Sequence, residues 1–318
     1  MPKRINALIL FSGGLDSILS VKLLQKQRIK VTGLVFVSYF FNSQLATKAA
    51  KKLKIKLKIV NFSEEHFKIV KKPEYGYGKA MNPCIDCHLL MLKKAKKIME
   101  DSVRDEKFDF IATGEVLGER PMSQNRQALE LIERESGLKG YLLRPLSAKL
   151  LEPTVAEKKG LVNRDKFLDI SGRSRKRQMA LAKKWKIKEY PTPAGGCLLT
   201  DPQFGQRLKE LLEKWPKAQG NDVELLKLGR HFWATPAPEK TQRGVESNKI
   251  IVGRNKEENK KIKKLAQKGD LVIEPRDFPG PTVLIRSKNK LFKESLAKAK
   301  ELMIKHSPKL RRKLGIDK

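Results

Sequence analysis

Cysteine is scarce in this chain of 318 residues, which contains only 3. An odd and small number does not build the disulfide framework of secreted proteins, so we expect a reducing, cytoplasmic setting. Long apolar runs are also missing, and none approaches the roughly 18 residues that a membrane-spanning helix needs. Lys3 and Arg4 precede an apolar run too short for a signal peptide. These absences predict a protein without a membrane partner.

Acidic residues are the second shortage, with 35 Asp and Glu against 69 Lys and Arg, a formal net charge of +34. A lysine-rich solvated surface, common at high growth temperature, is the alternative interpretation. That trend usually raises Glu together with Lys, whereas here the acids lag by half. The imbalance therefore favours a polyanionic partner, with nucleic acid ahead of a membrane surface.

The first half of the chain alternates between short apolar runs and amphipathic stretches. Strands are predicted at residues 6–11, 30–40, 56–62 and 108–115, and helices at 15–27, 43–54 and 88–101. This order predicts an α/β fold with a doubly wound parallel sheet, whose ligands bind beyond the carboxyl ends of the strands. We expect two domains: residues 1–220, which carry the three cysteines, and residues 221–318, a smaller, basic α+β module with a Lys-rich tail.

The first predicted strand runs into "SGGLDS", residues 12–17, where a helix begins. A helix N-terminus holds phosphate through its unpaired N–H groups, and glycines let the backbone approach closely. The motif lacks the GK[ST] ending of a Walker A loop. Asp16 inside a phosphate loop would repel the ligand unless a cation shares the site, so it predicts Mg²⁺. The alternative is an ordinary tight turn with a capping serine.

This motif after a first strand resembles the PP-loop of the ATP pyrophosphatases. The resemblance implies that ATP is bound with its pyrophosphate on the loop and that an adenylate is formed. It leaves the acceptor of the adenylyl group open.

The three cysteines form a second constellation. Cys84 and Cys87 make a C-x-x-C at the start of a predicted helix, and Cys197 lies in the Gly-rich "PAGGCLLTDP". Three thiolates suit a [4Fe–4S] cluster with one iron open to a non-protein ligand, or a zinc site that His88 would complete. A redox pair and unrelated buried cysteines are the remaining alternatives.

Residues 113–146 resemble a segment of the tRNA 4-thiouridine synthetases, "TGE-x-LGQ…SQT…RPL". The match is carried by Thr113 to Glu115, by Leu117 and Gly118, by Ser123 and Gln124, and by "RPL" at residues 144–146. It departs at Glu119, where the family has Gln, and at an inserted-looking stretch, residues 120–122.

The resemblance implies adenylation of a tRNA uridine and its thiolation. It also implies a [4Fe–4S] cluster on Cys84, Cys87 and Cys197, as in the archaeal-type members, and catalytic roles for these cysteines and for Asp16. Lys149 or Arg144 would offset charge on the AMP. The ATP-binding residues expected are Ser12, Gly13, Gly14, Leu15, Asp16, Ser17, Phe36, Thr113, Gly114 and Glu115.

RNA binding is expected from two further regions. Residues 226–287, with "VGRN" and a later "D…PG…V" run, resemble the RNA-binding domain of the NFACT proteins, which points to Arg254 and Arg276. Residues 171–179, "SGRSRKRQM", contain four basic side chains that could neutralise phosphates: Arg173, Arg175, Lys176 and Arg177. A solvated loop is the ordinary alternative.

The predicted function is thus an ATP-dependent tRNA sulfurtransferase that uses ATP, Mg²⁺ and a [4Fe–4S] cluster. A persulfide carried by Cys197 or Cys87 is the alternative sulfur source. Modification of another RNA base and a non-catalytic RNA-binding protein are the alternative functions. The partners expected are tRNA and a sulfur donor, either sulfide or a persulfide-carrying protein, and a homodimer is left open.

Overall fold

The computed structural model describes residues 5–103, 107–191, 196–235, 247–276 and 278–316. The chain divides into two compact units, Met1–Thr200 and Asp201–Lys318. Within the described ranges, no helix is both long enough and apolar enough to cross a membrane.

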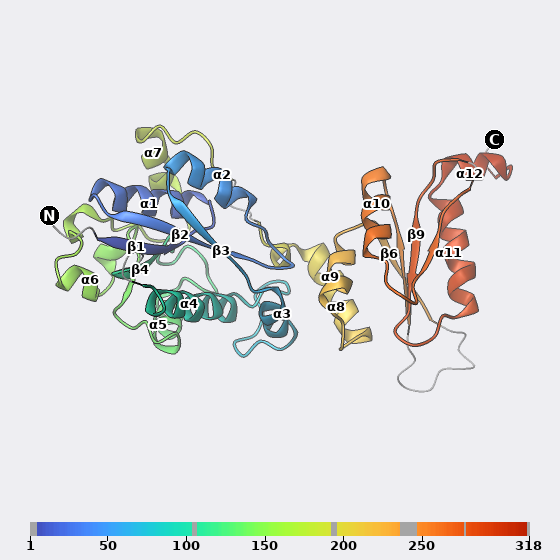
Figure 1. Ribbon diagram of the computed structural model, residues 1–318, viewed down its shortest axis with the longest axis horizontal. Coiled ribbons are helices and arrows are strands. Elements are labelled where there is room, and N and C mark those ends of the chain that lie inside the picture. The colour runs from blue at the N-terminus through green and yellow to red at the C-terminus, as the bar shows by residue number, and fades with distance from the viewer. Residues whose placement is uncertain (1–4, 104–106, 192–195, 236–246, 277, 317–318) are drawn as a thin grey trace. The chain divides into compact units, whose positions relative to one another are not determined.

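The first unit contains a five-stranded parallel sheet in the order β3-β2-β1-β4-β5 (Figure 1). Its strands are β1 (Asn6–Leu10), β2 (Lys30–Val37), β3 (Lys56–Asn61), β4 (Phe110–Thr113) and β5 (Leu142–Leu143). The order reverses between β1 and β4, because the chain leaves β1 toward β2 and β3 and later returns to the other side of β1. The predicted doubly wound α/β fold is confirmed.

Helices cover both faces of this sheet. The helices are α1 (Leu15–Lys26), α2 (Gln44–Leu53), α3 (Ser63–Lys71), α4 (Cys84–Glu100), α5 (Arg126–Glu135), α6 (Val155–Lys158) and α7 (Lys176–Lys184). Helices α1, α2 and α7 lie on one face and α4 and α5 on the other (Figure 1). Successive side chains of β1 explain this, because Ala7 and Ile9 pack into the first core cluster and Leu8 into the second.

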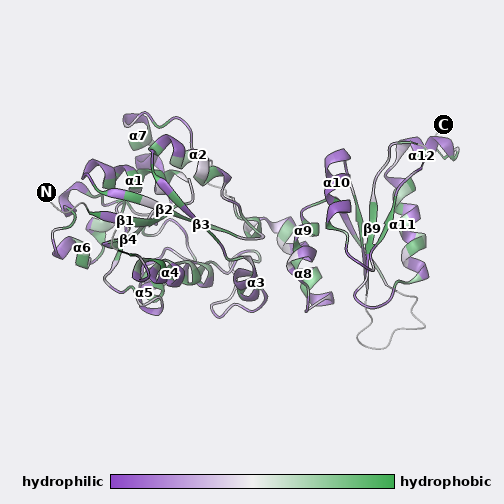
Figure 2. Ribbon diagram, viewed as in Figure 1, coloured by the Kyte–Doolittle hydropathy of each residue, from purple (hydrophilic) through white to green (hydrophobic). Residues whose placement is uncertain are grey.

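The second unit has a four-stranded antiparallel sheet in the order β6-β7-β9-β8. Its strands are β6 (Arg230–Ala234), β7 (Asn248–Val252), β8 (Leu271–Ile273) and β9 (Val283–Arg286). Its helices are α8 (Pro202–Lys214), α9 (Gly220–Leu226), α10 (Lys256–Leu265), α11 (Lys293–Lys305) and α12 (Pro308–Lys313). One face of the sheet packs on α11 and the other on α9 and α10. Figure 2 shows hydrophobic residues along the strands and hydrophilic residues on the outer sides of these helices.

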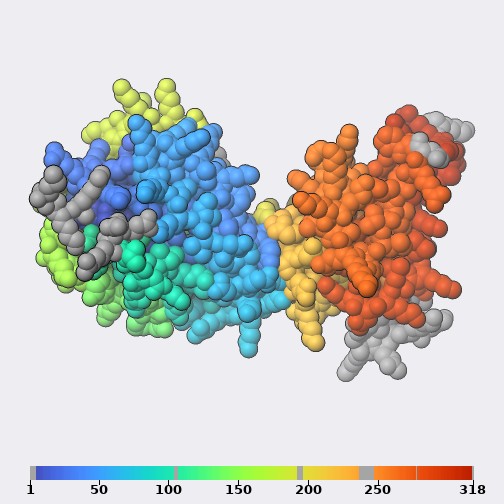
Figure 3. Space-filling view, in the orientation of Figure 1, coloured from blue at the N-terminus to red at the C-terminus, as the bar shows by residue number. Residues whose placement is uncertain are grey.

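The second unit begins 20 residues before the predicted boundary at 220/221. Trp215, just after α8, explains the difference, because its indole Nε1 donates a hydrogen bond to the carbonyl of Ser247, 3.2 Å away. Its ring also meets that of Trp233 edge-on, with centroids 5.2 Å apart. Figure 3 shows the yellow atoms of α8 and α9 packed directly against the orange atoms of this unit.

Candidate functional site

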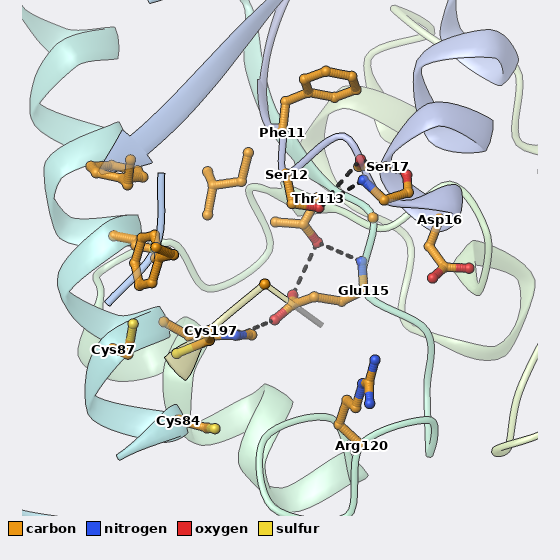
Figure 4. A pocket seen from close by; sticks show the side chains of 18 of the residues that line it. Phe11, Ser12, Asp16, Ser17, Cys84, Cys87, Thr113, Glu115, Arg120 and Cys197 are labelled. Atoms are coloured by element: carbon orange, nitrogen blue, oxygen red, sulfur yellow. Dashed lines mark hydrogen bonds and ion pairs between the residues drawn. The ribbon is translucent and has the colours of Figure 1, made fainter. Parts of the chain in front are cut away.

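A cavity of about 410 Å³ opens at the carboxyl ends of β1, β2 and β4, where the strand order reverses. This edge is where open α/β sheets bind their ligands. Every residue predicted from the sequence to bind ATP lines the cavity, except Gly13, and so do all three cysteines (Figure 4). The structure thus brings the SGGLDS motif, residues 12–17 and called the phosphate loop below, and the C-x-x-C motif to one pocket.

Gly13 shapes the turn instead of lining the pocket. Its φ of +75° lies in the left-handed region, and a Cβ there would come 2.6 Å from the backbone of Leu45 and Ala46, where α2 begins. The loop that follows is tied by its serines: the Gly14 N–H donates to Ser12 Oγ at 3.2 Å, and Ser17 Oγ donates to the Gly14 carbonyl at 2.9 Å. The glycine turn and these two hydrogen bonds therefore fix the backbone conformation that places the start of α1 at the pocket.

Gly114 brings the end of β4 against the same helix start. A Cβ at Gly114 would lie 2.6 Å from the amide nitrogen of Ser17. Thr113 and Glu115, on either side of Gly114, therefore lie beside the phosphate loop, although some 100 residues of sequence separate the two segments.

Asp16 supplies a carboxylate suited to a cation. Burial raises the pKa of this carboxyl, while the charges of Arg175 and Arg120 oppose that rise. Its Oδ1 is buried and has no hydrogen-bond partner. An unpartnered carboxylate oxygen beside a phosphate-binding turn fits Mg²⁺, which takes oxygen ligands and bridges to phosphates.

The three thiols lie close enough to affect one another. Burial raises the pKa of Cys87 well above its ordinary value, and the neighbouring Cys197 and Cys84 raise it further. Burial likewise raises the pKa of Cys197 to about 11. Asn82 Nδ2 donates to Cys84 Sγ at 3.1 Å, which opposes the rise that burial causes in the pKa of that thiol.

The zinc alternative finds no support in the described part of the chain. There, no group of three or more His, Cys, Asp and Glu side chains is arranged to hold a single metal ion. His88, the suggested fourth ligand, instead has its Nδ1 2.8 Å from Glu115 Oε1. A four-iron cluster does not require its thiolates to converge on one ion, so the three cysteines remain suited to it by donor type.

Glu115 anchors a buried network at the pocket wall. Its carboxylate accepts hydrogen bonds from Thr113 Oγ1 at 3.0 Å and Arg144 Nε at 2.9 Å, in addition to its contact with His88. Burial alone would raise the pKa of Glu115, but Arg144 and His88 outweigh it and lower the value to about 2. The carboxylate is thus already engaged within the protein.

Arg144 was expected to offset charge on the AMP, and the structure gives it another position. Its side chain is 1% exposed and is ion-paired with Glu115 and Glu133. Neither Arg144 nor Lys149 lines the cavity. Arg144 therefore supports the wall that carries Glu115.

The basic side chains predicted to contact RNA have different surroundings. Arg173, Lys176 and Arg276 are exposed, while Arg177 is ion-paired with Asp169 and Arg254 with Glu258. Arg175 alone among them lines the cavity. RNA contact by the exposed residues stays a prediction.

Several cavity residues were missed from the sequence. Arg120 and Glu119 lie in the stretch that departs from the 4-thiouridine synthetase pattern, and that departure was the available signal. His66, which the sequence analysis does not single out, also lines the cavity, although it is fully buried. Nothing in the sequence around His66 distinguishes it from a core histidine.

Comparison with known families agrees with this geometry. Residues 5–157 match the family described as the tRNA methyl transferase HUP domain. These residues form a PP-loop HUP domain. Residues 241–313 of this PP-loop protein match the NFACT protein RNA binding domain. Both predicted resemblances, to PP-loop tRNA thiolation enzymes and to the NFACT RNA-binding domain, are confirmed.

Curated relatives of the PP-loop protein include two proteins named tRNA-specific 2-thiouridylase MnmA. The protein of Haemophilus ducreyi is 27% identical over 250 residues, which cover 72% of this chain and 60% of that protein. The protein of Photorhabdus laumondii is 31% identical over 183 residues, 49% of each chain. The PP-loop protein thus spans less than two thirds of the length of these relatives.

Among solved structures, a 4-thiouridine synthetase–RNA complex with bound ATP aligns with a TM-score of 0.36 and 18% identity. The alignment covers 69% of this chain and 53% of that one.

Proposed function

We propose that the PP-loop protein is an ATP-dependent tRNA sulfurtransferase that adenylates a uridine carbonyl and replaces its oxygen by sulfur. The observation that carries the proposal is that the phosphate loop and all three cysteines line one cavity. Activation and sulfur delivery must act on the same carbon, so their groups have to meet in one place. The names of the curated relatives, 2-thiouridylases, support the same class of reaction.

Adenylation solves the problem of the leaving group. A uracil carbonyl oxygen leaves poorly, whereas AMP leaves readily. The uridine oxygen attacks the α-phosphate of ATP, the bond to pyrophosphate breaks, and the uracil N3 proton is lost to a base. The N–H groups at the start of α1 and the hydroxyls of Ser12 and Ser17 would hold the departing pyrophosphate. Asp16 would hold Mg²⁺, which offsets the charge that develops there.

Sulfur delivery is assigned to the three cysteines. Cys84, Cys87 and Cys197 would hold a [4Fe–4S] cluster as thiolates, and because their pKa values are raised without metal, iron binding would release protons. When bound, such a cluster supplies sulfide at the iron that lacks a protein ligand. The sulfur forms a bond to the activated carbon, AMP leaves, and the proton returns to N3.

A persulfide is the second candidate source, favoured by the presence of all three thiols in one cavity. Cys197 or Cys87 would carry the outer sulfur, and attack by another thiol on the inner sulfur would complete its transfer as a disulfide forms. Cys84, Cys87 and Cys197 all line the cavity, so the attacking thiol would come from this set.

The deciding experiment combines metal analysis with a cysteine variant. Purification without oxygen, followed by iron and labile-sulfide counts, is expected to find about four irons per chain if a cluster is the sulfur carrier. Thiouridine formation is then measured in tRNA with ATP and either sulfide or a persulfide donor. Cys84→Ala should abolish thiolation and leave RNA affinity unchanged.

Each outcome has a distinct meaning. An iron-free protein that thiolates tRNA with a persulfide donor would replace the cluster by persulfide chemistry. A wild-type protein that binds RNA but forms no thiouridine with either donor would contradict the proposed function and favour a non-catalytic RNA-binding protein.

A further inference from the structure

Two loops that are distant in the sequence are joined beside the cavity. Leu117, after β4, forms an isolated β-bridge with Ser171, and the Gly172 N–H donates to the Leu117 carbonyl at 2.7 Å. The buried hydroxyl of Ser147 links the same two loops, because it accepts from the Leu117 N–H at 3.0 Å and donates to the Ile170 carbonyl at 2.6 Å. The two loops therefore hold a definite position relative to each other.

Each of these loops brings one arginine to the cavity. Arg120 comes three residues after Leu117, and Arg175 three residues after Gly172. Figure 4 shows the Arg120 guanidinium on the Asp16 side of the cavity. The Nε of Arg175 is buried and has no hydrogen-bond partner. A buried guanidinium N–H without an acceptor costs free energy until a ligand supplies one.

Charge explains what such a ligand would be. Both arginines act on the carboxyls of Asp16 and Glu119: burial raises the pKa of each, and Arg120 and Arg175 both lower it. Without ligand, two guanidinium groups balance two carboxylates. When Mg²⁺ and ATP bind, the negative charge of the two carboxylates and the triphosphate exceeds the positive charge of Mg²⁺. The two guanidinium groups would offset about half of this remaining negative charge. Guanidinium groups pair bidentately with phosphate oxygens.

We infer that Arg175, together with Arg120, binds the phosphate groups of ATP opposite the phosphate loop. Arg175 then belongs to the nucleotide site, and not to the surface that its neighbours in the basic run, residues 171–179, are predicted to offer to RNA. Those neighbours differ in structure, because Arg173 is exposed and Arg177 is ion-paired with Asp169. The inference rests on the proposed function, since it requires that ATP occupies this cavity.

The test measures the affinities of ATP, pyrophosphate and adenosine in the absence of RNA, by calorimetry, for the wild type, Arg175→Ala, Arg175→Lys and Arg173→Ala. Arg175→Ala is expected to weaken ATP and pyrophosphate binding by about 10- to 100-fold. Adenosine affinity should not change, because adenosine carries no phosphate. Arg173→Ala, the matched control from the same basic run, should bind ATP like the wild type.

RNA affinity is measured for the same variants without ATP. Arg175→Ala should retain it, while a loss of RNA affinity with unchanged ATP affinity would overturn the inference and return Arg175 to the RNA surface. Thermal unfolding checks that each variant is folded; should Arg175→Ala be unfolded, Arg175→Lys, which keeps the charge but not the bidentate geometry, must still weaken ATP binding.

Different results would contradict the proposed function and the role of Arg175. A wild type that binds neither ATP nor pyrophosphate overturns the proposed function and this inference together. A wild type that binds ATP, with Arg175→Ala and Arg175→Lys equal to it, overturns the inference alone.

Discussion

His66 is a fully buried histidine whose two ring nitrogens have no hydrogen-bond partner. Its ring stacks on Phe62 with centroids 4.9 Å apart and an interplanar angle of 4°. Burial lowers the pKa of His66 from 6.5 to about 4, so the native state holds the ring neutral. An unpaired buried polar group costs about 1–3 kcal/mol. At the scale of a single residue, His66 therefore lowers the stability of the first unit.

His66→Phe is expected to raise the free energy of unfolding by about 1 kcal/mol or more at pH 7.5. It should also reduce the loss of stability in acid. Because the folded pKa is the lower one, the unfolded chain takes up the proton first, and stability falls as the pH drops from 6.5 toward 4. The variant should lose about 2 kcal/mol less over that window.

Urea unfolding at a series of pH values measures this difference. His306→Phe serves as a control, because burial lowers the pKa of His306 without enclosing its ring to the same degree. An unchanged pH slope in His66→Phe would show that another group causes the acid sensitivity.

At the scale of the element, the start of α1 depends on one glycine more than on its neighbour. Gly13 has a φ of +75° and would bring a Cβ within 2.6 Å of backbone atoms at the start of α2. Gly14 has a φ of −75°, and a Cβ there would meet only the side-chain oxygen of Ser12, at 3.3 Å. Backbone atoms cannot yield as a rotatable hydroxyl can.

Gly13→Ala is expected to destabilise the protein by about 2 kcal/mol or more and to abolish ATP binding. The added Cβ would force residues 12–17 away from the start of α2 and so change the backbone that meets the phosphates. Gly14→Ala, the matched control, should cost less stability and weaken ATP binding less. Thermal unfolding and calorimetry with ATP measure both effects. Equal losses in the two variants would mean that close approach of the phosphate, and not the turn, sets the requirement for glycine.

At the scale of the whole molecule, the chain consists of two units whose division falls at 200/201 and not at 220/221. Trp215 is 4% exposed and bonds to Ser247, so α8 and α9 complete the core of the second unit. The net charge of +34 agrees with the RNA partner proposed above.

A fragment of residues 201–318 is therefore expected to unfold cooperatively on heating. A fragment of residues 221–318 should unfold at a lower temperature or lack a cooperative transition, because it exposes the surface that Trp215 covers. Circular dichroism during thermal unfolding compares the two. Similar transitions in both fragments would place the boundary at 220/221, as the composition of the sequence suggests.

Sequence alone was sufficient for features that local patterns encode. Short apolar runs predicted β1, β2 and β4, because strands buried on both faces must be short and continuously apolar. The run at residues 56–62 predicted β3, which is more exposed. The SGGLDS turn was placed correctly, because glycine and helix-start preferences act over a few residues. The domain boundary was less accessible, because Trp215 makes its contacts with residues far along the chain.

Only the tertiary structure decided which distant side chains share the cavity. Arg173 and Arg175 look equivalent in the sequence, yet only Arg175 lines the cavity, because a bridge to Leu117 directs its loop there. Arg144 reads as a free basic residue, yet its charge is enclosed with Glu115 and Glu133. The burial of Arg144 and its ion pairs depend on contacts between residues far apart in the sequence. The sequence by itself determined the elements and the phosphate loop, and the packing of β4 and its following loops against α1 decided which charges meet there.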